Sequence, residues 1–200
     1  MIGGEISMRA VGTTGVAILT VVGIAFAIQQ SSLRATEPNA GSASTAAVDT
    51  EGHLRVPPDY WANYQSLGSW AIAADDGRGS KELHVVYASP GTIDAYRRDK
   101  RFPDGAVLIK EVFRTATGDM TTGTVSRAGA LKGWFVMVKD SANRHAGNPL
   151  WGDGWGWSWF DATDPAKTTS TDYKVDCQSC HVPAQASDWV YVDGYPALKR

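Results

Sequence analysis

Runs of apolar or alternating residues separated by turn residues recur between residues 81 and 161 and predict strands. The expected strands are 81–88 (KELHVVYA), 106–115 (AVLIKEVFRT), 133–139 (GWFVMVK) and 155–161 (WGWSWFD). Helices are expected at about 59–65 and 91–100, where proline lies in or just before the first turn. Residues 118–132 and 141–154 have a loop-like composition. The pattern predicts an α+β fold, a mainly antiparallel β-sheet with flanking helices.

The N-terminal part has a different pattern. An uncharged apolar run, 16–28, follows Arg9, which is typical of a secretory signal. The run is also nearly long enough to cross a bilayer, which takes about 20 residues. We therefore expect 1–30 to be a cleaved signal peptide or a retained inner-membrane anchor, and the rest of the chain to be periplasmic. Residues 31–52 are rich in Ser, Ala, Thr and Gly and predict a flexible linker before a domain at 53–200.

Composition narrows the class of protein. The 200 residues carry a net charge of −2, with 20% charged and 43% hydrophobic residues, which is typical of a globular protein. No basic stripe is present, so no nucleic-acid partner is expected. The eight tryptophans suit a core or the wall of an apolar cofactor pocket. The two cysteines are too few for a disulfide framework.

The two cysteines lie in one motif, Cys177-Gln178-Ser179-Cys180-His181, which is the C-x-x-C-H pattern of haem attachment. Two thiols three residues apart can add to the two vinyl groups of one porphyrin, and the adjacent histidine can then ligate the iron. We expect one covalently bound haem c, with His181 as the metal ligand. A thioredoxin-type pair, a zinc site and a structural disulfide fit less well, because the pair follows a polar loop near the C-terminus and zinc needs about four ligands.

The other axial position of the iron has no obvious protein ligand. Neither methionine nor histidine occurs after His181. Met120, Met137, His84 and His145 are the alternatives, but Met137 is expected in the core and Met120 at the surface. An open site is favoured, and an open site binds small molecules such as nitric oxide or hydroxylamine.

Lys110 is unusual because it shares a predicted strand face with Ala106, Leu108 and Val112. An ammonium group on an apolar face is costly unless it is paired, neutral or modified. One interpretation is a lysine that reaches water or pairs with Glu82 or Glu111. The other is a buried amine, which loses its proton more easily and becomes a nucleophile.

Three segments resemble the cytochrome P-460 family: YASPGTIDAYRRDKRFPDGAVLIKEVF at 87–113, GWFVMVKDSANRH at 133–145, and CQSCHVPAQASDWVYVDGYPAL at 177–198. The resemblance covers about residues 57–199. It implies a sheet with flanking helices, in most members as a homodimer. In this family a lysine is joined to a meso carbon of the porphyrin, and Lys110 stands at the matching position. Members with this link oxidise hydroxylamine, whereas the related cytochromes c′-β lack it and bind gases such as nitric oxide.

The resemblance also implies a carboxylate that relays protons, lying between the last long strand and the cysteine pair. Asp161, Asp164, Asp172 and Asp176 lie there, and we select Asp172. The period-two tryptophans Trp155, Trp157 and Trp159 are expected to point one way, into the core or towards the haem.

The function expected from the resemblance is an exported mono-haem cytochrome that oxidises hydroxylamine, alone or with nitric oxide, and passes electrons to a periplasmic cytochrome. Two alternatives stay open. One is a non-enzymatic gas-binding protein of the c′-β type, and the other is a plain electron carrier with methionine as the sixth ligand.

Overall fold

The computed structural model describes residues 40–199. The predicted signal or anchor at 1–30 and the first part of the predicted linker therefore lie outside the described residues. Within 40–199, no helix is long and apolar enough to cross a membrane.

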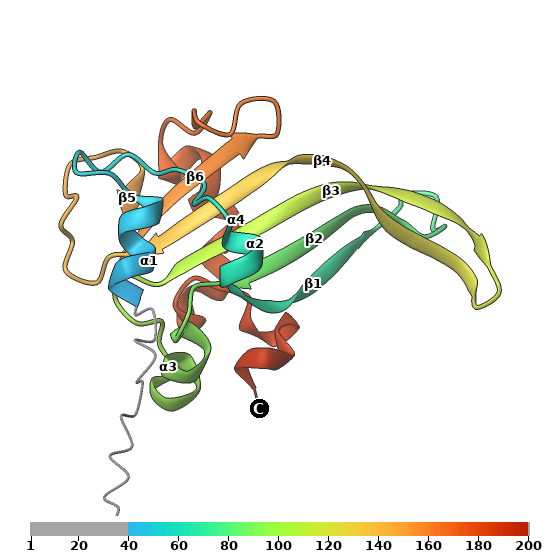
Figure 1. Cartoon of the computed structure of the whole chain (residues 1–200), viewed down its shortest axis with the longest axis horizontal. Coiled ribbons are helices and arrows are strands. Elements are labelled where there is room, and N and C mark those ends of the chain that lie inside the picture. Colours follow the sequence, from blue (N-terminus) through green and yellow to red (C-terminus); the bar gives the residue numbers. More distant parts are fainter. Residues whose placement is uncertain (1–39, 200) are drawn as a thin grey trace, which may run out of the picture. The chain divides into compact units, whose positions relative to one another are not determined.

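A six-stranded sheet forms the centre of the described domain (Figure 1). Its strand order is β1-β2-β3-β4-β6-β5, and every neighbouring pair is antiparallel. This architecture confirms the predicted α+β class with a mainly antiparallel sheet. The strands are β1 (Gln65–Ala73), β2 (Ser80–Ala88), β3 (Val107–Met120), β4 (Gly123–Lys139), β5 (Trp151–Gly152) and β6 (Trp155–Asp161).

Helices are short and lie outside the sheet. They are α1 (Ala40–Ala47), α2 (Tyr60–Asn63), α3 (Thr92–Asp99) and α4 (Ser179–His181). A π-helical turn, Lys174–Gln178, precedes α4, and 3₁₀ turns at Val182–Ser187, Val192–Gly194 and Pro196–Leu198 follow it. The C-terminal segment is thus a series of tight turns.

The β3–β4 hairpin differs from the expectation of a loop at 118–132. Register pairs continue from Thr115↔Ala128 to Met120↔Gly123. Figure 1 shows this part of the hairpin running beyond the other strands. Its residues are mostly small or polar and exposed, so they lack the apolar period that identifies a strand. Strand β1 was likewise not predicted, and it shortens the helix expected at 59–65 to Tyr60–Asn63.

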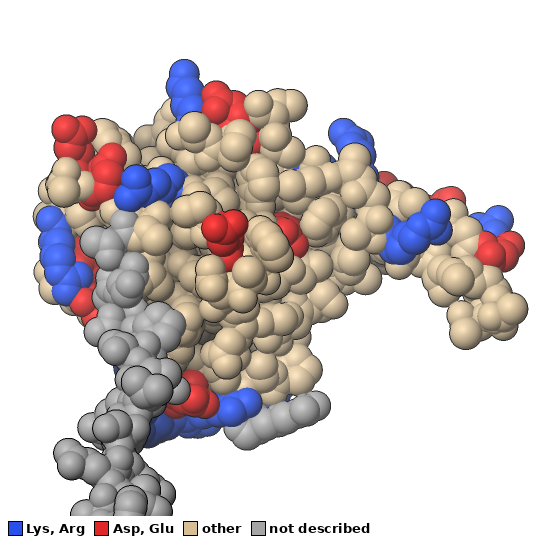
Figure 2. Space-filling model, viewed as in Figure 1, with Lys and Arg blue, Asp and Glu red and all other residues tan. Residues whose placement is uncertain are grey.

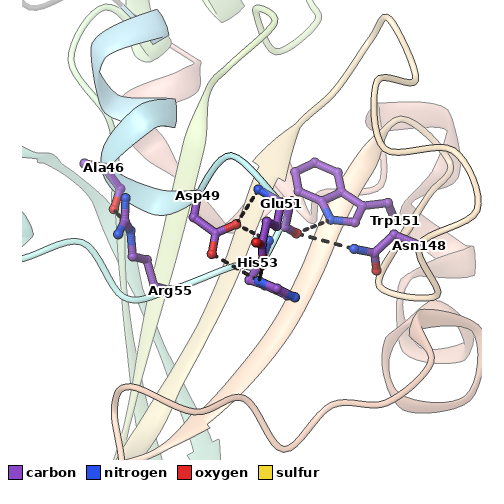
Figure 3. A network of polar contacts seen from close by, with 8 residues as sticks. Ala46, Asp49, Glu51, His53, Arg55, Asn148 and Trp151 are labelled. Carbon is purple, nitrogen blue, oxygen red and sulfur yellow. Dashed lines mark hydrogen bonds and ion pairs between the residues drawn. The ribbon is translucent and has the colours of Figure 1, made fainter.

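Helix α1 lies inside the segment that was expected to be a linker. Ala43 and Ala47 are buried against Val138 and Trp151 in one hydrophobic cluster. Figure 3 shows the turn that follows. The Asp49 carboxylate accepts hydrogen bonds there from the backbone N–H groups of Glu51 and His53.

Trp151 then fixes this turn to β5, because its indole Nε1 donates to the Gly52 carbonyl at 2.9 Å. Packing against the sheet therefore begins at least as early as Ala43. Small alanines can pack closely, although they give no strong apolar period in the sequence.

Alternation along the strands divides the core into two clusters. On β3, Val107 and Ile109 belong to the cluster that also contains α1 and Tyr60. Leu108 belongs to the other cluster, together with the C-terminal residues Trp189 and Leu198. The C-terminal turns therefore cover one sheet face, and α1 covers part of the other. On the face seen in Figure 2, basic and acidic side chains are scattered with both signs intermixed.

Candidate functional site

A cavity of about 610 Å³ lies between the sheet and the C-terminal turns. Small-molecule and cofactor sites typically have volumes of roughly 300–1,000 Å³. One wall consists of strand residues from β1, β2, β3, β4 and β6, and the opposite wall comes from the C-terminal segment. The strand residues include Trp70, Ile72, Glu82, His84, Val86, Leu108, Lys110, Val112, Phe135, Met137, Trp157 and Trp159; the C-terminal ones are Asp176, Cys177, Cys180, His181, Val190, Tyr191 and Tyr195.

Strand register explains how distant residues meet in this wall. Val86, Lys110, Phe135 and Trp159 are direct neighbours in one row across four strands. Side chains of such a row project from the same sheet face. This places Lys110 in the middle of the wall, as its alternating pattern predicted.

Cys177 and Cys180 line the cavity from the opposite side and form no disulfide. Cys177 lies in the π-helical turn and is buried, whereas Cys180 in α4 is exposed. Burial raises the pKa of the Cys177 thiol to about 11, so this group is held as the neutral thiol. The two sulfur positions flank the cavity as a doubly tethered cofactor requires.

His181 has one ring nitrogen engaged and one available. Its Nδ1 lies 2.7 Å from the Trp189 carbonyl oxygen. A carbonyl only accepts, so Nδ1 carries the proton and Nε2 keeps its lone pair. Burial lowers the pKa of His181, which also favours the neutral ring. Trp157 packs edge-on at 4.9 Å between ring centroids, so the imidazole is held in the form that ligates a metal.

Lys110 has apolar surroundings. Its Nζ lies 4.3 Å from the centroid of the Phe135 ring. Burial lowers the pKa of the Lys110 ammonium, because the charged form loses hydration. The carboxylates considered as its partners have other contacts, since Glu82 binds Lys132 and Glu111 accepts from Tyr60 Oη. The structure therefore favours a half-buried amine that faces the cavity over a paired surface lysine.

A polar group on β2 and β4 lies in the wall. From the sequence, His84 was expected only as an alternative iron ligand and Glu82 only as a possible partner of Lys110, and neither the contact between the two nor the presence of Lys132 was predicted. Glu82 accepts from Lys132, and His84 Nε2 lies 3.0 Å from Glu82 Oε2. All three line the cavity. A carboxylate only accepts, so Nε2 of His84 is the donor and Nδ1 is the basic nitrogen. The only available signal was that Glu82, His84 and Val86 alternate along one strand face.

Of the two acidic residues nearest the cysteines, Asp176 lines the cavity and Asp172 does not. Asp172 does not line the cavity, and its Oδ1 accepts from Lys174 N in a local turn. Asp176 does line it, but is exposed and accepts from the backbone N–H groups of Thr171 and Asp172. The predicted proton-relay role of Asp172 therefore gains no support from its position and stays a prediction.

Of the four alternative iron ligands, two line the cavity and two do not. Met120 is 60% exposed in β3, and His145 packs on Trp151 away from the cavity. Met137 is a buried core residue that also lines the cavity, and His84 lines it while bound to Glu82. Only the last two lie in the wall.

The residues present fit a covalently bound haem. Two thiols flank a cavity of suitable volume, and a neutral imidazole with a free Nε2 follows directly in the chain. Aromatic and aliphatic side chains form most of the remaining wall.

Comparison with known proteins agrees with this geometry. No curated protein matches the chain significantly. The sequence model of the family described as Cytochrome P460 matches residues 58–192, which include all strands of the sheet and the C-x-x-C-H motif. The chain therefore belongs to the cytochrome P460 family and is a haem cytochrome of the c type.

Proposed function

We propose that this protein is an exported mono-haem cytochrome that oxidises hydroxylamine, alone or with nitric oxide. One observation carries the proposal: a single cavity brings Lys110 together with Cys177, Cys180 and His181. A reactive lysine has no purpose in a simple electron carrier. In the related family members, the lysine at this position is the one joined to the porphyrin.

The reaction with nitric oxide can be written NH₂OH + NO → N₂O + H₂O + H⁺ + e⁻, in which hydroxylamine nitrogen is oxidised. When bound, haem supplies the electron acceptor and the position at which a small nitrogen compound binds. The protein has to hold the group, exclude bulk water and accept the proton.

Residues of the cavity wall can hold the haem, alter its properties and exclude water. Cys177 and Cys180 tether, and His181 Nε2 ligates. Lys110, joined through Nζ, alters the shape and electronic properties of the macrocycle. Phe135 and Trp159, whose ring centroids lie 4.5 Å apart, form an apolar wall beside Lys110 that limits access of water.

His84 and Glu82 are better placed than Asp172 to accept the proton. Burial lowers the pKa of His84, so its Nδ1 is unprotonated near neutral pH. The pKa of Glu82 is lowered chiefly by its hydrogen bond from Lys132, so Glu82 remains an anion that can balance a cationic His84. A proton taken up at His84 Nδ1 would thus be stabilised by Glu82 through Nε2.

The test uses Lys110→Arg, because arginine keeps the positive charge but stays protonated and cannot form the bond. We expect the lysine–porphyrin link to shift the ferrous Soret band to the red. The variant should keep its haem through the two cysteines, and lose both this red shift and hydroxylamine oxidation. Mass spectrometry of the wild-type haem peptide should show a second peptide that carries Lys110. If only the 177–181 segment is attached, the enzymatic proposal is wrong.

Reversible gas binding is the second candidate, and the apolar wall around Phe135, Leu108 and Val112 favours it. A neutral diatomic ligand needs no proton acceptor. In that case the wild-type ferrous protein would bind nitric oxide, show an ordinary high-spin spectrum and leave hydroxylamine unchanged. Failure to bind nitric oxide or carbon monoxide at all would instead indicate Met137 or His84 as a sixth ligand, and a plain electron carrier.

Export, a periplasmic electron-accepting cytochrome and a homodimer belong to the same proposal. They rest on the apolar run at 16–28 and on the family resemblance. Cell fractionation should place the domain in the periplasm or on the inner membrane, and sedimentation should give the mass of a dimer. Recovery of the haem protein from the cytoplasm would contradict the location.

A further inference from the structure

A buried ion pair outside the cavity lies beside Trp189, the residue whose carbonyl is bonded to His181. Lys139, the last residue of β4, places its Nζ 2.6 Å from Asp188 Oδ1. The two side chains are only 10% and 7% exposed. Neither residue lines the cavity of the proposed haem, so binding of the cofactor does not explain the pair.

Asp188 is held at three further points. Its Oδ2 accepts from Phe102 N at 3.2 Å, and its backbone carbonyl accepts from Trp155 Nε1 at 3.0 Å. Its N–H donates to the Gln185 carbonyl at 3.2 Å. Lys139 Nζ also lies 4.9 Å from the centroid of the Trp155 ring. Groups from β4, β6 and the loop before β3 therefore meet at one aspartate.

The backbone at this position is strained. Asp188 and Trp189 have φ values of 61° and 67°, so two consecutive residues other than glycine adopt the left-handed conformation. Such strain persists only where the surrounding contacts over-determine it, and it is concentrated at functional sites. The contacts that can impose it here are those of Asp188.

The strained turn has a direct consequence for His181. The carbonyl of Trp189, one residue after Asp188, is the group that accepts from His181 Nδ1. The partner of the second ring nitrogen sets the tautomer, the orientation and the basicity of a ligating histidine. A displaced Trp189 carbonyl would weaken that hydrogen bond.

We propose that Lys139 and Asp188 are positioning residues that fix the Trp189 carbonyl against His181 and so tune the iron–histidine bond. The inference rests on the proposed ligation of haem iron by His181. It assigns a role to a lysine and an aspartate that do not line the cavity.

Asp188→Asn removes the charge of the side chain while keeping the backbone conformation, so it tests the charge alone. Asparagine tolerates the left-handed conformation and can still accept from Phe102 N, but it loses the ionic attraction to Lys139. Lys139→Met/Asp188→Asn removes both charges and leaves no unpaired buried ion, so it keeps the test valid if the single variant folds poorly. Lys139→Arg retains the charge and should retain most of the wild-type behaviour.

The readouts are the iron–histidine stretching band in the resonance Raman spectrum of the ferrous protein and the reduction potential. With a weaker Nδ1–H···O bond, His181 donates less electron density. The band should shift to lower frequency and the potential should rise in Asp188→Asn and in the double variant. Val138→Ala, on the opposite sheet face, serves as the control that lowers stability without touching this turn.

Variants that lose stability but keep the wild-type band and potential would overturn the inference, because the pair would then be only structural. A wild-type protein without an iron–histidine band would overturn the ligand assignment itself, and the inference with it. The two failures are therefore distinguishable.

Discussion

Glu82 shows at the scale of a single residue how a cavity wall can carry charge. It contacts Lys132 and His84 at once, and its side chain is 27% exposed. The hydrogen bond from Lys132 is the largest cause of its lowered pKa, and the bond with His84 is the next. The anion is thus stabilised in the folded state, and stability must depend on pH.

The sign of this dependence follows from the direction of the shift. The usual value is 4.5 and the folded pKa is lower, so the stabilisation is complete above about pH 4.5 and is lost as the pH falls through the folded pKa. We expect Glu82→Gln to lower the unfolding free energy by about 1 kcal/mol at pH 7 and by much less at pH 3. Urea denaturation at both pH values measures the difference. Lys132→Met should reproduce it, and an equal loss at both pH values would contradict the explanation.

Strand β6 supplies the tryptophans that link the sheet to the C-terminal turns. Trp155 and Trp157 are 0% and 1% exposed, and Trp159 is the less buried third member. Trp155 and Trp157 belong to one core cluster, and Trp157 and Trp159 line the cavity, so the three share one sheet face, as the period-two pattern predicted. Trp157 makes two kinds of contact, because it belongs to the core cluster and also packs against the His181 ring.

At the scale of this element, we expect Trp157→Ala to destabilise the domain by about 3–5 kcal/mol, the usual cost of emptying a large buried aromatic site. The ferrous spectrum should change as well, since the His181 ring loses its neighbour. Trp61→Ala is the matched control, because Trp61 is 67% exposed and should change stability by less than about 0.5 kcal/mol. Chemical denaturation measures both. Similar losses in the two variants would show that burial of Trp157 is not what matters.

At the scale of the described domain, the main feature is that the C-terminal turns, 174–198, form the wall of the cavity opposite the sheet. Cys177 and His181 face strands that end many residues earlier in the sequence. Covalent haem would join these two layers, and its packing against the sheet and its ligation by His181 exist only in the folded state, so they add to the stability of that state.

We therefore expect Cys177→Ala/Cys180→Ala, made in the Lys110→Arg background so that no lysine link can hold the haem, to yield no haem-staining band on a denaturing gel and to unfold at a lower temperature than Lys110→Arg alone. Each single cysteine variant should keep one thioether and a weaker band. Ser179→Ala, between the two cysteines, should stain like the wild type. A stained band from the double cysteine variant in the Lys110→Arg background would refute covalent attachment through this motif.

Local signals were enough for much of the fold. The strands at 81–88 and 155–161, the helix near 91–100 and the placing of Lys110 on an apolar face all follow from short-range alternation and turn chemistry, which are readable in one segment. Strand β1 and the distal β3–β4 hairpin could not be read in this way. Their residues carry no strong period, and their pairing partners, not their own composition, make them strands.

By itself, the sequence determined the haem-attachment motif, the mainly antiparallel sheet and the unusual Lys110, because each is a property of neighbouring residues. Only the tertiary structure decided what stands near that lysine. Strand register placed Glu82 and His84 in the same wall, and a local turn before the cysteines holds Asp172 outside it. The C-terminal turns bring Asp188 to Lys139, and they bring the carbonyl of the next residue, Trp189, to the His181 ring. Lys139 and Asp188 are 49 residues apart in the sequence, and their contact depends on packing, which no local pattern encodes.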